Sequence, residues 1–106
     1  MASGILGQSA PSATTLTTVY TVPANTLSVV NVSITNRGSS SANVRLALAA
    51  ASTPVNSEYI EYDAVLLPNG VLERTGIALN ETKRVVVYSS TADTSVSVFG
   101  LEQSTL

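Results

Sequence analysis

The sequence contains no cysteine, no histidine and no tryptophan. Without cysteine there is no disulfide, no thiolate metal site and no thiol nucleophile. Without histidine there is no Ser–His–Asp triad, and the usual general base at neutral pH is missing. Stability must therefore come from packing and strand pairing. We predict a protein that is not an enzyme, with no catalytic residue, no cofactor-binding residue and no metal ligand.

Charged residues are also scarce. They make up 11% of the 106 residues, whereas roughly 25% is typical of soluble proteins, and apolar residues make up 44%. The net charge is only -2. Surface charge usually keeps a protein soluble. Because this chain has so little charge, we expect other subunits to cover part of its surface. Five basic against seven acidic residues argue against nucleic acid as a partner, because nucleic-acid binding needs a basic face.

Long apolar runs are missing as well. No run approaches the roughly 20 residues that span a bilayer. The first fifteen residues, MASGILGQSAPSATT, lack the basic segment and the long apolar segment of a signal peptide. We therefore expect no membrane partner and a protein that is made and assembled in a cytoplasm.

Short β-branched runs, separated by turn signals about every ten residues, begin at Thr14. This pattern is typical of an all-β fold, and 106 residues suffice for one domain. We predict an antiparallel β-sandwich of about seven to eight strands over residues 14–106, of jelly-roll or Ig-like type. Residues 1–13 are predicted to form an extended N-terminal arm, because they mix small residues around one apolar pair. Seven strands are predicted: Leu16–Val22, Leu27–Asn36, Asn43–Ala49, Glu58–Leu67, Val71–Leu79, Lys83–Ser89 and Ser95–Leu101.

Two of these strands carry an unusual apolar pattern. In the second, Leu27 and Val29 are apolar at odd positions, whereas apolar residues occupy even positions from Val30 to Ile34. This predicts that the inward-facing side switches near Val29 and Val30, through a β-bulge or a strand end covered on both faces. In the sixth, the uninterrupted run of valines at 85–87 predicts a strand covered on both faces.

Acidic residues are concentrated in EYIEYD, residues 58–63. Glu61 and Asp63 are two positions apart on a predicted strand, so they should share a face and could share a cation or an arginine. Neither a third ligand nor a glycine-bearing loop accompanies them, which disfavours a hydrolase or a calcium site. We interpret the pair as a charged face, solvated or between subunits. Arg74 belongs to a separate charged doublet, Glu73-Arg74, for which cross-strand or cross-subunit ion pairing is preferred to anion binding.

The tyrosines of the same stretch allow a second interpretation. Tyr59 and Tyr62 could stack on sugar rings while Glu61 and Asp63 bind hydroxyl groups, as in a glycan-binding module for host attachment. Such modules often use tryptophan, which this chain lacks. Packing or interface use of the tyrosines is therefore the preferred interpretation.

The order of several segments suggests a family. The segments VYTVPANT, ITNRG, SANVRLALA, EYIEYD, LPNGVLERTGIAL and KRVVVYSSTADTSVSVFGLE run over about residues 14–102. In this order they resemble small virion structural proteins of tailed bacteriophages, and MASGILGQSAP looks like the start of the same proteins. None of these segments is catalytic or highly specific alone. The resemblance implies an accessory protein of the virion, assembled in the host cytoplasm.

The same resemblance implies partners. We expect self-association as a homotrimer or another closed oligomer, and binding to the major capsid protein or another virion protein. A capsid decoration or cement protein is preferred, and a tail, neck or fibre component is the alternative. The candidate assembly contacts are Ile5, Leu6, Val29, Arg37, Glu61, Asp63 and Arg74.

Overall fold

The computed structural model describes residues 3–106, and over these residues the protein is all-β apart from one short 3₁₀ turn, η1. None of its helical segments within residues 3–106 is long and apolar enough to cross a membrane. The elements are β1 (Ser3–Ser9), β2 (Thr17–Thr21), β3 (Thr26–Asn36), β4 (Ala42–Ala49), η1 (Asn56–Glu58), β5 (Tyr59–Leu66), β6 (Val71–Leu79), β7 (Arg84–Ser89) and β8 (Thr94–Ser104).

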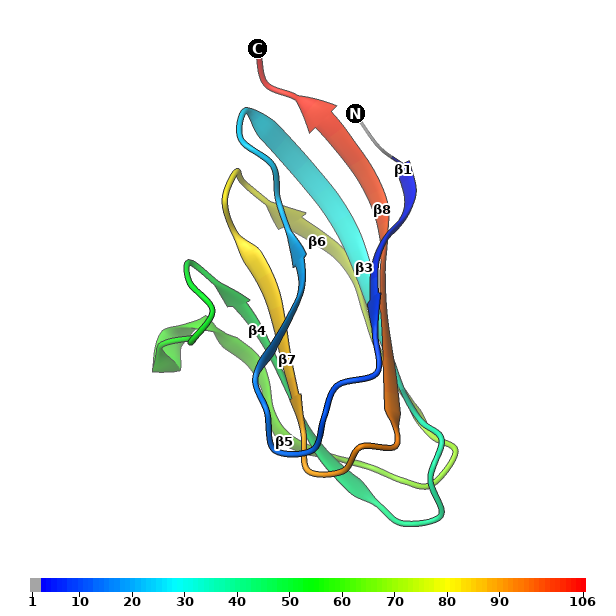
Figure 1. Cartoon of the computed structure of the whole chain (residues 1–106). Coiled ribbons are helices and arrows are strands. Elements are labelled where there is room, and N and C mark those ends of the chain that lie inside the picture. The colour runs from blue at the N-terminus through cyan, green and yellow to red at the C-terminus, as the bar shows by residue number, and fades with distance from the viewer. Residues whose placement is uncertain (1–2) are drawn as a thin grey trace.

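The strands form two four-stranded antiparallel sheets (Figure 1). Sheet 1 has the order β1-β8-β3-β6, and sheet 2 has the order β2-β7-β4-β5. The pairings are nested along the chain: β4 pairs with β5, β3 with β6, β2 with β7 and β1 with β8. Two further pairings, β3 with β8 and β4 with β7, complete the sheets.

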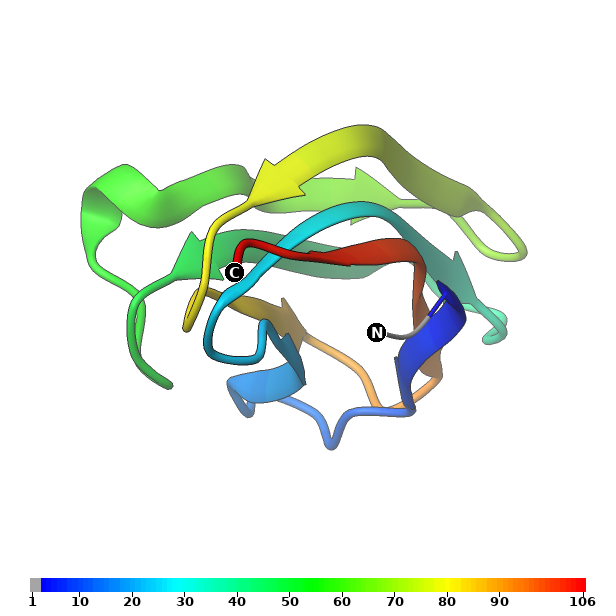
Figure 2. The same cartoon turned by 90° about the horizontal axis from the view of Figure 1, so that it is seen from above.

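One hydrophobic core lies between the two sheets, in a sandwich-like arrangement. Figure 2 shows the same arrangement from above. Val30 and Ile34 enter the core from sheet 1, and Val44, Leu46 and Val87 enter it from sheet 2; all five are at most 2% exposed. Alternating side chains point to opposite faces of a strand, so each sheet turns one set of residues inward and the other outward.

Tyr20 of β2 closes one end of this core. Its ring is buried, and its hydroxyl is 2.7 Å from the Ser28 hydroxyl and donates to Glu102 at 2.5 Å. Burial, and secondarily the Glu102 carboxylate, raise the pKa of Tyr20 to about 12. This tyrosine is a packing residue whose polar end finds partners at the rim of the core.

All seven strands that the sequence predicts are present, each within a few residues of the expected bounds. The prediction of a strand covered on both faces is confirmed in β7, where Val85, Val86 and Val87 are at most 1% exposed. Local alternation and turn signals were therefore sufficient to place these strands.

The predicted switch of the inward-facing side in β3 is wrong. Ser28 is buried and Val30 follows it on the inner face, so the alternation runs through β3 without interruption. Leu27 and Val29 are 39% and 46% exposed and lie on the outer face. The irregularity instead lies in the β3–β6 pairing, between Val30 and Val32 of β3. A small buried serine at an inward position made the pattern look shifted.

The N-terminal segment differs from the expected arm. Ser3–Ser9 is extended, but it forms an edge strand of sheet 1 and pairs with β8. Leu6 packs against the core and Pro11 is buried. A Cβ on Gly7 would lie 2.3 Å from the carbonyl oxygen of Val19, so only glycine allows this close approach of β1 and β2. The glycine and serine residues of this strand give no apolar alternation, so the sequence pattern did not predict it.

Candidate functional site

The outer face of sheet 2 carries an aromatic and cationic cluster. The Arg45 guanidinium carbon lies 4.2 Å from the centre of the Tyr62 ring and 4.4 Å from that of Tyr88. Tyr59 meets Tyr62 edge to face, with ring centres 5.0 Å apart. Such contacts are attractive because each ring presents a negative face to a cation and to the positive edge of another ring.

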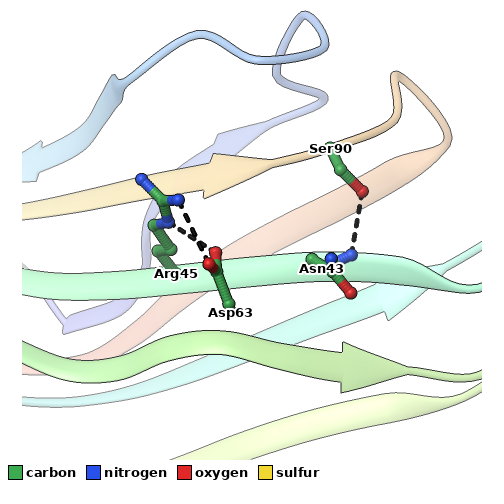
Figure 3. A network of polar contacts seen from close by, with 4 residues as sticks. All are labelled: Asn43, Arg45, Asp63 and Ser90. Atoms are coloured by element: carbon green, nitrogen blue, oxygen red, sulfur yellow. Dashed lines mark hydrogen bonds and ion pairs between the residues drawn. The ribbon is translucent and has the colours of Figure 1, made fainter.

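Arg45 is also bound to Asp63 (Figure 3). Its Nε donates to Oδ1 of Asp63 at 2.6 Å, and a second guanidinium nitrogen donates to Oδ2 at 3.2 Å. Asp63 has φ of +51°, at a register irregularity of the β4–β5 pairing that lies opposite Arg45. The hydrogen bond to Asp63 raises the pKa of Arg45 above its ordinary value. The guanidinium is therefore bound by Asp63 and by the rings of Tyr62 and Tyr88.

A small second hydrophobic cluster lies on this same outer face. Ala47 and Ala49 of β4 and Val86 of β7 are at most 1% exposed, and Tyr59 packs against them. We call the outer face of sheet 2 the covered face, because side chains of the chain itself bury the apolar residues of β4 and β7 on it, although Val65 of the edge strand β5 stays exposed.

The loop between β4 and β5 lies next to this cluster and is held by Glu58. One carboxylate oxygen accepts a hydrogen bond from the backbone N–H of Val55 at 2.9 Å, and the other accepts one from Ala50 at 3.0 Å. These two hydrogen bonds, that from Val55 first, lower the pKa of Glu58. The loop that leads into Tyr59 is therefore fixed by a carboxylate.

The outer face of sheet 1 is different, and we call it the open face. Residues paired across antiparallel strands point to the same face. Ile5 is paired with Phe99, and Val29 is paired with both Leu101 and Ala78, so their side chains share the outer face. Leu27 precedes this group on β3. The apolar patch of the open face is formed by Ile5, Leu27, Val29, Ala78, Phe99 and Leu101.

This apolar patch is exposed. Ile5, Val29 and Leu101 are 61%, 46% and 63% exposed. Farther along β3 and β8 the open face carries hydroxyl side chains, among them the paired Ser33 and Ser97. Glu73 is the one charged side chain that the register places on this face within residues 3–106. The open face is therefore apolar at one end and almost uncharged; its other end is hydroxyl-rich but also carries Val71, which is paired with Thr35 and exposed.

The structure places the first four candidate contacts in three settings. Ile5 and Val29 come together on the open face, two strands apart. Leu6 points the other way and packs against the core. Arg37 donates hydrogen bonds to the carbonyl oxygens of Ala92, at 3.2 Å, and Thr94, at 3.5 Å. Its side chain thus holds the turn before β8.

The remaining candidates form two separate ion pairs, contrary to the expectation that Glu61 and Asp63 share a face. Asp63 pairs with Arg45 on the covered face, whereas Glu61 pairs with Arg74 of β6. The positive φ of Asp63 breaks the simple alternation on which that expectation depended. The Glu61–Arg74 pair links the edge strands of the two sheets.

Sequence reasoning missed most of the apolar patch. Phe99 and Leu101 are apolar at odd positions, while Val96 and Val98 face the core from even ones. Apolar residues at both odd and even positions were visible in the sequence of β8, as they were around Leu27 and Val29 in β3. Only the pairing of β8 with both β1 and β3 shows that these residues form one surface.

Over residues 3–106 the surface forms no pocket, and no group of three side chains is arranged to hold a metal ion. The two outer faces are therefore the surfaces that offer a candidate function. Comparisons of the chain with protein-family models, with curated proteins and with solved structures found no match.

Proposed function

We propose that this chain is a non-enzymatic structural protein of a bacteriophage particle. In the preferred form it is a capsid decoration or cement protein that self-associates and binds the particle surface. It acts through its surface, by covering apolar area on other copies and on a neighbouring virion protein such as the major capsid protein. The resemblance in segment order suggests the particle, and the structure offers a surface suited to assembly.

The open face is the observation that carries this proposal. Monomeric soluble proteins rarely expose large contiguous apolar patches, and those that do commonly use them for binding. Here three apolar side chains about half exposed or more, those of Ile5, Val29 and Leu101, lie on the same face of one sheet. Burying them against another subunit removes apolar surface from water, which is the main driving force of association.

We also propose that the sandwich is of the jelly-roll type. The nested pairings and the orders β1-β8-β3-β6 and β2-β7-β4-β5 support this type over an Ig-like one. Jelly rolls are used in viral capsid and lectin domains, so the topology is compatible with a virion role, although fold analogy alone does not assign function.

Purified phage particles whose genome encodes this chain provide the test. Mass spectrometry of the particles should detect the chain, and gold-labelled antibodies against it should decorate heads in electron micrographs. Label on tails, necks or fibres would favour the alternative location in the particle. Absence of the chain from particles that are otherwise complete would overturn the proposal.

A second candidate function, glycan binding, is favoured by one observation. Tyr62 is 60% exposed, and its ring is held in place by Arg45 and Tyr59. A fixed, exposed tyrosine can stack on a sugar ring. Titration with host polysaccharides at millimolar sugar should give binding that Tyr62→Ala removes. No binding at that concentration would dispose of this candidate.

A further inference from the structure

We infer that the open face is a self-association surface, which pairs with the open face of a second copy of this chain in a two-fold, face-to-face dimer. The inference depends on the self-association in the proposed function but not on the phage particle. It names the surface, the occupant and the symmetry.

The size of the open face fits such a dimer. The strands β1, β8, β3 and β6 have 7, 11, 11 and 9 residues, and each residue covers about 3.4 Å along its strand and about 4.8 Å across it. The outline is therefore about 620 Å² per copy, at the lower end of the range for specific interfaces, which begins at about 600 Å² per partner. One face, paired with its own copy, is large enough for a stable dimer.

The charge of the open face also fits a second copy. A two-fold contact places the same surface on both sides, so a face with several charges of one sign would repel itself. Here Glu73 is the one charged side chain on the face within residues 3–106, and it lies on the edge strand β6, away from the patch at Ile5 and Leu101. A charged partner would gain nothing from this face, whereas an identical apolar patch matches it.

The geometry of sheets favours the same occupant. Two sheets with the usual right-handed twist pack face to face with their strands about 30° apart and about 10 Å between layers. A second copy supplies a sheet of the same twist and the same apolar patch. In the dimer, Val29 and Leu101 become core-like residues of a second sheet-on-sheet interface.

Sedimentation equilibrium of the full chain tests the inference with a matched pair of variants. Val29→Lys and Leu101→Lys each place a charge on the open face. Val65→Lys places the same charge on β5 of sheet 2, where Val65 is 66% exposed and paired with Asn43 on the outer side. The wild type and Val65→Lys should both dimerise with dissociation constants within about twofold. Val29→Lys and Leu101→Lys should weaken dimerisation by at least about tenfold.

Folding is checked separately by circular dichroism and urea unfolding. Both measurements should show that all three lysine variants are folded. Since the chain has no cysteine, Val29→Cys and Leu101→Cys provide a second measurement. Thiol labelling at both sites should become slower as protein concentration rises, while labelling of Val65→Cys should not change.

Three results would overturn the inference. The first is a wild-type chain that stays monomeric at millimolar concentration. The second is a trimer or larger ring, because an isologous face-to-face contact closes at two copies. The third is dimerisation that survives both lysine substitutions. A monomeric chain that is nevertheless found on particles would reject this dimer and the self-association in the proposed function, and would leave only the role in the particle standing. A chain that dimerises through the open face but is absent from particles would reject the role in the particle and leave this inference standing.

Discussion

The outer faces of the two sheets differ in how far their apolar side chains are exposed. On the covered face, Ala47 and Val86 are at most 1% exposed, because Tyr59 packs on them. On the open face, Val29 and Leu101 remain 46% and 63% exposed. Both faces belong to four-stranded sheets of one domain, so the difference lies in the side chains. The chain thus covers the apolar residues of β4 and β7 with its own side chains and leaves those of β3 and β8 on the open face exposed.

The covered face also shows why its charges are poor candidates for assembly. Arg45 is already bound to Asp63 and to two tyrosine rings. A partner would have to displace these contacts before gaining new ones. The open face imposes no such cost, because nothing on it must be broken before an apolar surface is buried.

The largest expected effect is a loss of stability from a charge beneath the covered face. Val86→Asp should lower the free energy of unfolding by about 3–5 kcal/mol, because it buries an unpaired carboxylate. Val29→Asp, on the central strand of the other sheet, should cost about 1 kcal/mol or less, because the site is solvated. Urea unfolding at low micromolar protein measures both. Equal losses would show that the two faces do not differ.

A smaller effect is expected from removing the ring that covers this face. Tyr59→Ala exposes Ala47, Ala49 and Val86 and should cost about 1–2 kcal/mol. Tyr59→Phe keeps the ring and should stay within about 0.5 kcal/mol of the wild type, as should Leu101→Ala on the open face. Thermal or urea unfolding distinguishes these variants. A Tyr59→Ala protein as stable as Leu101→Ala would mean that Tyr59 does not cover the face.

A pH-dependent effect is expected at the loop that Glu58 holds. Hydrogen bonds from Val55 and Ala50 lower the pKa of Glu58 in the folded protein. The carboxylate therefore stabilises the fold above its unfolded pKa of about 4.3, and this contribution is lost as pH falls through the lower folded value. Glu58→Gln should have a lower urea midpoint than the wild type at pH 7. The two midpoints should converge near pH 3, and a constant difference would contradict the assignment.

The smallest expected effect is that of salt on self-association. A contact through the open face involves one charged side chain per copy, Glu73, so screening has little to act on. Raising NaCl from about 0.05 to 0.5 M should change the dissociation constant of the dimer by less than about twofold. A tenfold weakening would point to a contact through ion pairs, such as Arg45–Asp63 of the covered face, instead of the open face.

Much of the fold could be predicted from local patterns. Seven strands followed from alternation and turn residues, and the valine run at 85–87 correctly indicated a strand covered on both faces. Ser3–Ser9 was not recognised as a strand, because glycine and serine give little alternation to detect. The apparent phase switch in β3 was wrong, because Ser28 is a small polar residue at a buried position.

The candidate site was less predictable. Ile5 and Val29 were selected as separate contacts, and only the pairing of β8 with both β1 and β3 joined them to Phe99 and Leu101. The partners of Glu61 and Asp63 were not predictable, because a positive φ at Asp63 turned the two carboxylates toward different arginines.

The sequence by itself determined seven of the eight strands that residues 3–106 form, and the residue types that rule out thiol and histidine chemistry. These properties depend on composition and on neighbours within a strand, where alternation has a period of two. The tertiary structure decided which outward-facing apolar side chains are covered. That outcome depends on contacts between residues far apart in the chain, such as Arg45 with Tyr88 on the covered face and Ile5 with Phe99 on the open one. Strand pairing brings such residues together, and no local pattern encodes it.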